Sequence, residues 1–333
     1  GVELHRCRAT VKGPHEVCLL ENDRLVTAKH ILIAVGGAPF VPDIEGAHHA
    51  ITSNEAFDLP TMPKDVVIVG GGYIACEFAC ILNGLGVEVT QYYRGAQILR
   101  GFDEEARGLI SEEMIRNGVG LHLGTNIIEM EKLDRGFRVK STNGDEKQFD
   151  QVMFATGRAP NTPELGLERA GVKLGRNGAI EVDAYSQTSV PSIYAIGDVT
   201  DRVNLTPVAI REGMAFVETV FNGNPTPVDH ALIPTAIFTQ PEFGTIGLSE
   251  EEARDQEPIE VYCTSFKPMQ QAFAGREDRV LMKLIVSQET RRVLGCHIVA
   301  PGAGEMIQLA GIAVKMGATK EDFDRTVAGH PTM

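Results

Sequence analysis

The clearest pattern of apolar and polar positions in the chain begins at residue 66. Four apolar residues, Val66 to Val69, run directly into three glycines, Gly70 to Gly72. Apolar positions then recur with helical spacing from Tyr73 to Leu82, and residues 87–93 again have a strand pattern. This order predicts a strand, a tight glycine turn, a helix and a second strand.

Downstream, the pattern predicts a further helix and a hairpin. Asp103 is placed to cap a helix that extends to about residue 117. Residues 137–141 and 147–154 have strand patterns on either side of Asn143-Gly144, a pair typical of hairpin turns. The segment from 66 to 154 is therefore predicted to be an α/β unit.

The segments around this unit have their own patterns. Residues 2–20 alternate in strand fashion, and residues 25–35 predict strands that end at the break Gly36-Gly37-Ala38-Pro39. Residues 193–196 form a short apolar run before Gly197 and Asp198, which places Asp198 at the strand end where α/β proteins bind ligands.

A strong helix is predicted next, with Thr206 as its N-cap and an apolar pattern that continues to Phe221. Its first turn would present N–H groups and partial positive charge to an anion. The same features fit an ordinary capped helix, so the residues alone leave both interpretations open.

The last part of the chain changes to strands followed by a helix. Strands are predicted at 235–239, 259–265, 279–286 and 293–299, and an apolar helix at 305–316. This order indicates an α+β domain with an antiparallel sheet. The helix is apolar on too many faces for one core, which predicts a second face buried against another subunit.

Composition excludes several classes of protein. The chain has 333 residues, 43% of them hydrophobic, and its formal charge of -14 disfavours nucleic acid or an anionic membrane as a partner. No apolar run approaches the roughly 18 residues of a membrane span, and no basic-then-apolar leader opens the chain. We therefore expect a soluble, cytoplasmic protein.

The six cysteines form no CxxC pair, which argues against a zinc site and against a secreted disulfide framework. Cys76 and Cys80 are four residues apart on the first predicted helix. We interpret them as packed apolar side chains, because helical geometry suits a disulfide poorly there.

The glycine turn has the spacing of a dinucleotide site. Gly70, Gly72 and Ala75 are small residues at positions where the backbone approaches a pyrophosphate on a helix N-terminus. An acidic residue at the end of the second strand would favour NAD. This chain has Tyr93 there, followed by Arg94 and later by Arg100. Two guanidiniums there favour the 2'-phosphate of NADPH. The alternative to a dinucleotide site is a tight turn that binds no ligand. The alternative to a 2'-phosphate site is a pair of arginines that are simply solvated at the surface.

Together these segments resemble the pyridine nucleotide-disulfide oxidoreductase family over the whole chain. The segments that carry the resemblance occur in the family's order: Gly70-Gly71-Gly72-Tyr73-Ile74-Ala75-Cys76-Glu77, Ala155-Thr156-Gly157-Arg158, Tyr194-Ala195-Ile196-Gly197-Asp198, Leu205-Thr206-Pro207-Val208-Ala209, Lys315-Met316-Gly317-Ala318-Thr319-Lys320 and His330-Pro331-Thr332.

The resemblance implies an α/β flavoenzyme in four segments. Residues 1–38 would be a remnant of an FAD-binding domain, 39–157 an inserted Rossmann-like NADPH-binding domain, 158–228 a second FAD-binding or central segment, and 229–333 an α+β dimerisation domain. In such enzymes NADPH reduces FAD, FAD reduces an active-site disulfide, and the dithiol reduces the substrate. The pattern is closest to members that act on glutathione disulfide.

The resemblance also assigns roles. Tyr73 would be the gate over the flavin that NADPH displaces, and Glu77 would lie near the nicotinamide and the flavin. Asp198 would bind a ribityl hydroxyl, and the helix start at Leu205 and Thr206 would face the pyrimidine ring. The other expected cofactor-binding residues are Gly36, Gly70, Gly72, Ile74, Ala75, Arg94, Arg100 and Gly157.

His330 would be the general acid/base that activates a thiol and protonates the departing glutathione. In the family this histidine serves the disulfide of the partner subunit, which implies an obligate homodimer.

The chain also departs from the family pattern. It lacks the family's first GxGxxG and its redox CxxxxC, and it stops before the glutamate that pairs with the histidine. We therefore expect a fragment that does not run the full cycle alone. Met214 stands where some members have a glutathione-contacting arginine, which leaves the substrate open.

Three other functions stay open. A trypanothione-like or other low-molecular-weight disulfide would be read mostly by the missing residues. Dihydrolipoamide dehydrogenase uses NAD and would require an acidic residue at position 93, where this chain has Tyr93. A module that binds NADPH and dimerises without redox activity would hold no flavin.

Overall fold

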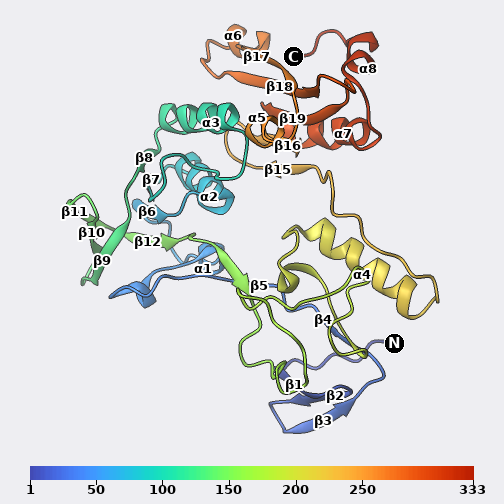
Figure 1. Cartoon of the computed structure of the whole chain (residues 1–333). Helices are drawn as coiled ribbons and strands as arrows, with labels where there is room; N and C mark the ends of the chain where they lie inside the picture. Colours follow the sequence, from blue (N-terminus) through green and yellow to red (C-terminus); the bar gives the residue numbers. More distant parts are fainter. The chain divides into compact units, whose positions relative to one another are not determined.

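The computed structural model describes residues 1–333 as two compact units (Figure 1). The first unit comprises residues 1–40 and 158–230, and the second comprises residues 41–157 and 231–333. The chain thus leaves the first unit once and returns to it.

Residues 41–157 of the second unit are built on a parallel sheet in the order β12-β6-β7-β8. Its strands are β6 (Asp65–Val69), β7 (Glu88–Tyr93), β8 (Gly120–Leu123) and β12 (Gln151–Phe154). The helices of this part are α1 (Ser53–Ala56), α2 (Tyr73–Gly84) and α3 (Glu104–Arg116), with the 3-10 turn η1 (Ala47–His49). The predicted strand, turn, helix and second strand are confirmed.

Strand β6 is buried on both faces because each face has its own cover. Val66 and Ile68 pack into a core with α2 and α3. Val67 and Val69 pack on the other side against a three-stranded antiparallel sheet. That sheet consists of β9 (Ile127–Lys132), β10 (Phe137–Ser141) and β11 (Glu146–Phe149). A continuous apolar run is what a strand covered on both faces requires.

The hairpin prediction was right for its first half only. Strands β10 and β11 pair antiparallel around the predicted turn. The chain then breaks at Asp150, and β12 pairs parallel with β6. Because β6 lies more than 80 residues before β12, the local alternation of residues 147–154 does not show that the second half leaves the hairpin.

The helix cap at Asp103 is confirmed. Its carboxylate accepts a hydrogen bond from the Ala106 N–H at 3.3 Å, and α3 ends before Asn117.

The last part of the second unit is a five-stranded antiparallel sheet in the order β15-β16-β19-β18-β17. Its strands are β15 (Thr235–Ile237), β16 (Phe243–Gly247), β17 (Ile259–Phe266), β18 (Val280–Ser287) and β19 (Val293–Val299). The helices here are α5 (Glu250–Arg254), α6 (Met269–Phe273), α7 (Ala303–Lys315) and α8 (Lys320–Arg325). The antiparallel sheet and the long helix are as predicted.

Strand β16 was missed, because its glycines read as turn residues. Gly244 is needed there for packing: a Cβ would lie 2.5 Å from the Ala303 carbonyl oxygen and 2.7 Å from the Ile307 side chain. Helix α7 therefore rests directly on the backbone of β16.

The first unit contains three small sheets. Strands β1 (Ala9–Gly13), β2 (Glu16–Leu19) and β3 (Arg24–Thr27) form an antiparallel sheet. Strand β4 (Ile31–Ile33) pairs parallel with β14 (Ile193–Ala195), and β5 (Gly37–Pro39) pairs antiparallel with β13 (Arg158–Pro160). The 3-10 turn η2 (Gly197–Thr200) and helix α4 (Thr206–Val220) complete the unit.

One expectation for this unit was wrong: residues 2–8 form no strand, although their sequence alternates. The predicted break at residues 36–39 does lie at the end of the unit's first segment, which stops at Phe40. It also holds a strand, because β13 supplies backbone partners from more than a hundred residues away.

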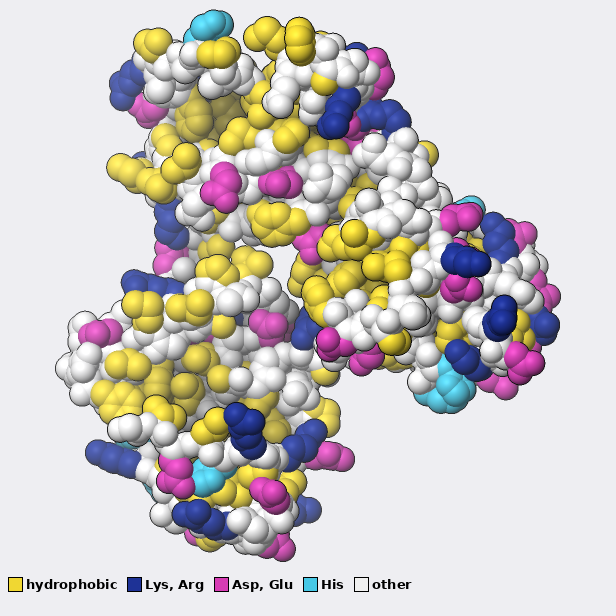
Figure 2. Space-filling view, turned by 180° about the vertical axis from the view of Figure 1, so that it is seen from behind, with side chains coloured by type: hydrophobic (Ala, Val, Ile, Leu, Met, Phe, Trp, Pro, Cys, Tyr) yellow, Lys and Arg dark blue, Asp and Glu magenta, His cyan; other side chains and the backbone are white.

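No helix of the structure has both the length and the apolar character needed to cross a bilayer. Apolar side chains are nevertheless exposed in patches on the surface, as the space-filling view shows (Figure 2).

Candidate functional site

The glycine turn between β6 and α2 is fixed by close backbone packing. Gly70 has φ 142°, and a Cβ there would lie 2.2 Å from the carbonyl oxygen of Ala155. Its N–H donates to the Tyr92 carbonyl at 2.9 Å, and its carbonyl accepts from Nε2 of the buried Gln91 at 2.9 Å. Only glycine fits this position.

Gly72 has a different role. It is the N-cap of α2 and offers no capping side chain, and a Cβ placed on it would meet no atom of the chain within 4 Å. The first turn of a helix has N–H groups without intrahelical acceptors, and the dipole makes that end positive. The open space in front of this end is what a phosphate group requires.

The predicted residues of α2 point in different directions. Tyr73 is 41% exposed, whereas Ala75 is fully buried against the turn. Ile74 is half-buried and packs against the core. The carboxylate of Glu77 accepts a hydrogen bond from the Phe238 N–H at 2.8 Å. Burial raises the pKa of Glu77, and the hydrogen bond from Phe238 opposes that rise.

The segment after β7 carries Arg94 and Arg100 and returns to the glycine turn. The Leu99 N–H donates to the Gly71 carbonyl at 2.6 Å, so the residue next to Arg100 is bonded to the turn itself. Both arginines are exposed. The Tyr93 ring lies over the turn, because a Cβ on Gly71 would be 2.4 Å from it.

Gly157 belongs to the same end of the sheet. It follows β12 two residues after Ala155, has φ 129°, and a Cβ there would contact nothing within 4 Å. The structure therefore brings Gly70, Gly72 and Gly157 to one sheet edge.

A second group of predicted residues meets in the first unit. Ile33 and Ala195 are register partners in the parallel pair β4–β14. Gly36 and Asp198 follow these strand ends, so both lie at the edge where open α/β sheets bind ligands. Gly36 has φ 68°, and its missing Cβ leaves open space.

The start of α4 corrects one prediction. Thr206 is not the N-cap but the first helical residue; Leu205 is the N-cap, and it provides no side-chain hydrogen bond. The Leu205 carbonyl accepts from the Val208 N–H at 3.0 Å and from the Ala209 N–H at 3.1 Å. The helix start lacks a capping oxygen, which leaves its first N–H groups to another acceptor.

A buried carboxylate that sequence reasoning missed supports the Asp198 turn. Glu212 of α4 is 1% exposed, and its Oε2 accepts from the Gly197 N–H at 2.7 Å. Its Oε1 lies 2.7 Å from both an Arg202 guanidinium nitrogen and Nε2 of His230. The signal was a glutamate on the apolar face of α4, between Val208 and Ala215.

His330 is exposed in the segment after α8. No hydrogen bond or ion pair of this chain joins it to the other predicted residues.

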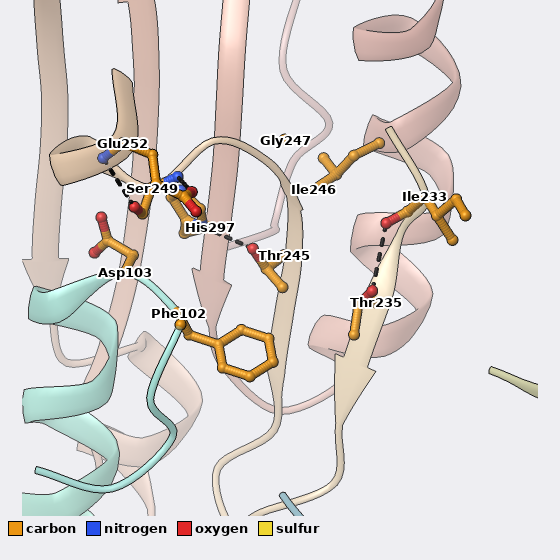
Figure 3. Close-up of a pocket in the computed structure, with 11 residues that line it drawn as sticks. Phe102, Asp103, Ile233, Thr235, Thr245, Ile246, Gly247, Ser249, Glu252 and His297 are labelled. Atoms are coloured by element: carbon orange, nitrogen blue, oxygen red, sulfur yellow. Dashed lines mark hydrogen bonds between the residues drawn. The ribbon is translucent and has the colours of Figure 1, made fainter. Parts of the chain in front are cut away.

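A cavity of about 150 Å³ lies between the start of α3 and the antiparallel sheet (Figure 3). On its wall, Nδ1 of His297 is hydrogen-bonded to the Thr245 hydroxyl at 2.8 Å, and Nε2 donates to the Leu248 carbonyl at 3.0 Å. Burial lowers the pKa of His297. Both ring nitrogens are used within the chain, so this cavity is a feature of packing.

Beside the cavity, a buried lysine gathers three carboxylates. Lys283 of β18 is 1% exposed, and its Nζ lies 3.0 Å from Asp103 and 2.7 Å from both Glu105 and Glu250. Burial acts to raise the pKa of Asp103, but the charges of His297 and Lys283 and the hydrogen bonds it accepts lower it overall. This cluster joins α3 to the antiparallel sheet.

All six cysteines are free. Burial raises the pKa of Cys76 and Cys296 to about 12, and it also raises the pKa of Cys80. Cys76 and Cys80 are buried in the core of α2, which confirms that they pack rather than form a disulfide.

Comparisons with known proteins agree with these features. The sequence model of the pyridine nucleotide-disulphide oxidoreductases matches residues 1–213, and that of their dimerisation domain matches residues 233–333.

Similar sequences cover the whole chain. Glutathione reductase of Burkholderia cepacia is 49% identical over 334 residues, which are 100% of this chain and 74% of that protein. The chloroplastic/mitochondrial glutathione reductase of Pisum sativum is also 49% identical, and the chain spans 60% of it. Trypanothione reductase of Leishmania donovani is 42% identical, and the chain spans 70% of it.

Among solved structures, the HOCl-induced flavoprotein disulfide reductase RclA from Escherichia coli superposes with a TM-score of 0.90. It is 24% identical, and the match covers 98% of this chain and 76% of that one. This likeness concerns the fold.

Proposed function

Because the chain belongs to the pyridine nucleotide-disulphide oxidoreductase family, we propose that it is part of an FAD-containing, NADPH-dependent reductase of glutathione disulfide. The observation that carries the proposal is the 49% identity to glutathione reductases over the full length of the chain. The overall reaction would consume one disulfide, one NADPH and one proton and release two thiols and NADP⁺.

The residues present fit the dinucleotide. Gly70 and Gly72 would admit the pyrophosphate to the start of α2, where no side chain competes for the N–H groups. Arg94 and Arg100 would bind the 2'-phosphate. Position 93 is a tyrosine, so no carboxylate stands there to repel the phosphate. Tyr73, Ile74, Glu77 and Gly157 would line the rest of the path. Ala75 is buried against Gly70, and its small side chain would let the turn pack closely there.

The first unit fits one side of a flavin site. Asp198 would accept a hydrogen bond from a hydroxyl of the ribityl chain, Gly36 would leave room for the cofactor, and the uncapped start of α4 at Leu205 and Thr206 would face its negative edge. Bound FAD supplies the transfer of electrons from NADPH to a disulfide. Glu212 would hold the Gly197–Asp198 turn in place through its hydrogen bond to the Gly197 N–H.

The proton chemistry would belong to His330. Its imidazole would take a proton from an attacking thiol and return it to the departing one, as thiol–disulfide exchange near neutral pH requires. The six cysteines here are not suited to be the exchanging dithiol. The only close pair, Cys76 and Cys80, is buried, and burial raises the pKa of both thiols.

We also propose a homodimer. The dimerisation-domain match covers the antiparallel sheet and α7. Leu309, Ile312 and Met316 are 71%, 55% and 82% exposed and lie three and four residues apart, on one side of the helix. An apolar stripe of this kind is typical of a helix that packs against a second copy.

The nucleotide assignment can be tested on this chain directly. In Arg94→Ala/Arg100→Ala we expect NADPH affinity to fall by roughly 10- to 100-fold per lost contact, since a charge-assisted hydrogen bond contributes about 1.5–3 kcal/mol. NADH affinity should change little. Calorimetric titration with both nucleotides measures the difference.

Arg135→Ala removes an exposed arginine from the β9–β10 turn and serves as the control. Equal losses for NADPH and NADH in the double variant would contradict the assignment.

The substrate needs a separate assay, because trypanothione reductase is also similar over the whole chain. The protein from its complete native reading frame should oxidise NADPH fastest with glutathione disulfide. Faster turnover with trypanothione disulfide or lipoamide would reject that substrate, and a protein that binds NADPH without flavin would favour a non-catalytic module.

A further inference from the structure

We propose that Arg107 is a positioning residue for nucleotide selectivity. It holds the loop of residues 94–101 in the shape that presents Arg94 and Arg100 to a 2'-phosphate. The inference rests on the proposed NADPH site and adds to it a residue outside the glycine turn.

The guanidinium of Arg107 binds the backbone of this loop at two successive carbonyls. Its Nε donates to the Ile98 carbonyl at 2.6 Å, and one terminal nitrogen donates to the Gln97 carbonyl at 3.0 Å. Arg107 extends from α3 and is half-buried. A planar fork with fixed donors holds two acceptors at a set angle, which a flexible ammonium does not.

The loop needs such support, because its conformation is unfavourable. Leu99 has φ 54°, the left-handed region that residues with a Cβ rarely adopt. Ile98 and Leu99 are both 0% exposed and anchor the loop in the core with α3. A strained residue of this kind persists where its surroundings hold it in place.

The remaining contacts fasten the two ends of the loop. The Leu99 N–H donates to the Gly71 carbonyl at 2.6 Å, which ties the Arg100 end to the glycine turn. At the Arg94 end, the Tyr93 and Gly95 carbonyls accept from the N–H groups of Thr125 and Gly124 at 3.0 and 3.1 Å.

Between these ties the middle of the loop depends on side chains. Gln97 donates from Nε2 to the Glu104 carbonyl at 3.1 Å, and Arg107 holds the two carbonyls described above. Removing Arg107 would leave the Ile98 carbonyl, next to a buried side chain, without its donor. The loop would relax, and the spacing of Arg94 and Arg100 would no longer be fixed.

This effect should be larger on binding of the 2'-phosphate than on binding of the rest of the nucleotide. The Gly70 and Gly72 backbone, which would contact the pyrophosphate common to both nucleotides, has no hydrogen bond to Arg107. We therefore expect Arg107→Ala to weaken NADPH binding about 10-fold and NADH binding less than about two-fold, so that the ratio of the two affinities falls.

The experiment titrates the chain with NADPH and NADH in four forms: unchanged, Arg107→Ala, Arg107→Lys and Arg135→Ala. Arg107→Lys keeps the charge without the planar fork, so its affinity ratio should fall to an intermediate value. Should Arg107→Ala fail to fold, Arg107→Lys answers the same question. Arg135→Ala removes one exposed arginine elsewhere and should leave the ratio unchanged.

Hydrogen exchange gives a second readout that does not involve a ligand. The Leu99 amide, which donates to Gly71, should exchange faster in Arg107→Ala, whereas the amides of β6 should not. An unchanged affinity ratio in both Arg107 variants, or equal losses for the two nucleotides, overturns the inference.

The result also separates this inference from the proposed function. If Arg94→Ala/Arg100→Ala loses selectivity while Arg107→Ala keeps it, only the positioning role fails. If both keep it, the 2'-phosphate assignment itself fails.

Discussion

At the scale of single residues, the three glycines of the turn have three different reasons to be glycine. Gly70 faces the Ala155 carbonyl, Gly71 lies under the Tyr93 ring, and Gly72 faces open space. The first two positions are set by packing within the chain. The third has no internal constraint, which makes it the position at which a ligand explains the residue best.

This difference separates folding from binding. Gly71→Ala would place a methyl group 2.4 Å from the Tyr93 ring. The ring cannot easily move away, because it also packs closely against the backbone of Gly95. We expect a loss of about 1–3 kcal/mol in the free energy of unfolding, as overpacking usually costs. Gly72→Ala should leave stability unchanged and weaken NADPH binding.

Thermal unfolding and NADPH titration of both variants check this prediction. A Gly72→Ala protein that is destabilised as much as Gly71→Ala would contradict the separation, as would one that binds NADPH normally.

The sequence revealed the residues whose role is local and missed those whose partners are distant. Gly70, Gly72 and the Asp103 cap were predicted, because the turn and the cap are read within a few neighbouring positions. Lys283 was not, since its partner Asp103 lies 180 residues away in the chain. Thr206 was misplaced by one position, because a threonine before proline resembles an N-cap while the backbone begins the helix at Thr206 itself.

At the scale of elements, the same rule holds. The unit β6–α2–β7 was predicted, because a strand covered on both faces gives a continuous apolar run. Strand β12 was taken for half of a hairpin, because its partner β6 lies far away in the sequence. Strand β16 was missed, because its glycine packs against the distant helix α7. Local patterns contain neither partner.

The cluster around Lys283 fastens α3 to the antiparallel sheet, and its charge makes that joint sensitive to pH. Lys283→Met should lower the free energy of unfolding by about 3–5 kcal/mol at neutral pH, because Asp103 would be left buried without its cation. Lys147→Met, at an exposed position, is the control.

The sign of the pH effect follows from Asp103. Its pKa is lowered in the folded chain, so its contribution is present above the unfolded value of about 3.9 and is lost as the pH falls through the folded value. Without Lys283, burial raises the pKa of Asp103 above its unfolded value, so the destabilisation by Lys283→Met should already shrink as the pH falls toward about 4 and should continue to shrink below it. Denaturant unfolding between pH 7 and pH 3 measures it; a difference that stays constant over this range would reject the role of Asp103.

At the scale of the whole molecule, the proposed dimer depends on a surface that this chain leaves exposed. Leu309→Glu places a charge in the apolar stripe of α7, where the side chain is 71% exposed and contributes little to the core. We expect the dimer dissociation constant to rise by at least about 100-fold, since a buried unpaired charge costs several kcal/mol.

Sedimentation velocity at several concentrations gives the oligomeric state. Leu85→Glu changes a leucine that is 61% exposed at the end of α2 and should leave the state unchanged. A Leu309→Glu protein that stays dimeric would place the interface elsewhere.

The pairing of β5 with β13 has a consequence for how such a chain can change over evolution. Pro39 and Arg158 are register partners, so the points where the chain departs and comes back lie about 5 Å apart, as in any antiparallel pair. A polypeptide of any length can be spliced between two such neighbouring points without displacing the scaffold. Residues 41–157 thus have the attachment geometry of an inserted domain, but an exchange would also have to keep the core and the Lys283 cluster that they share with residues 231–333.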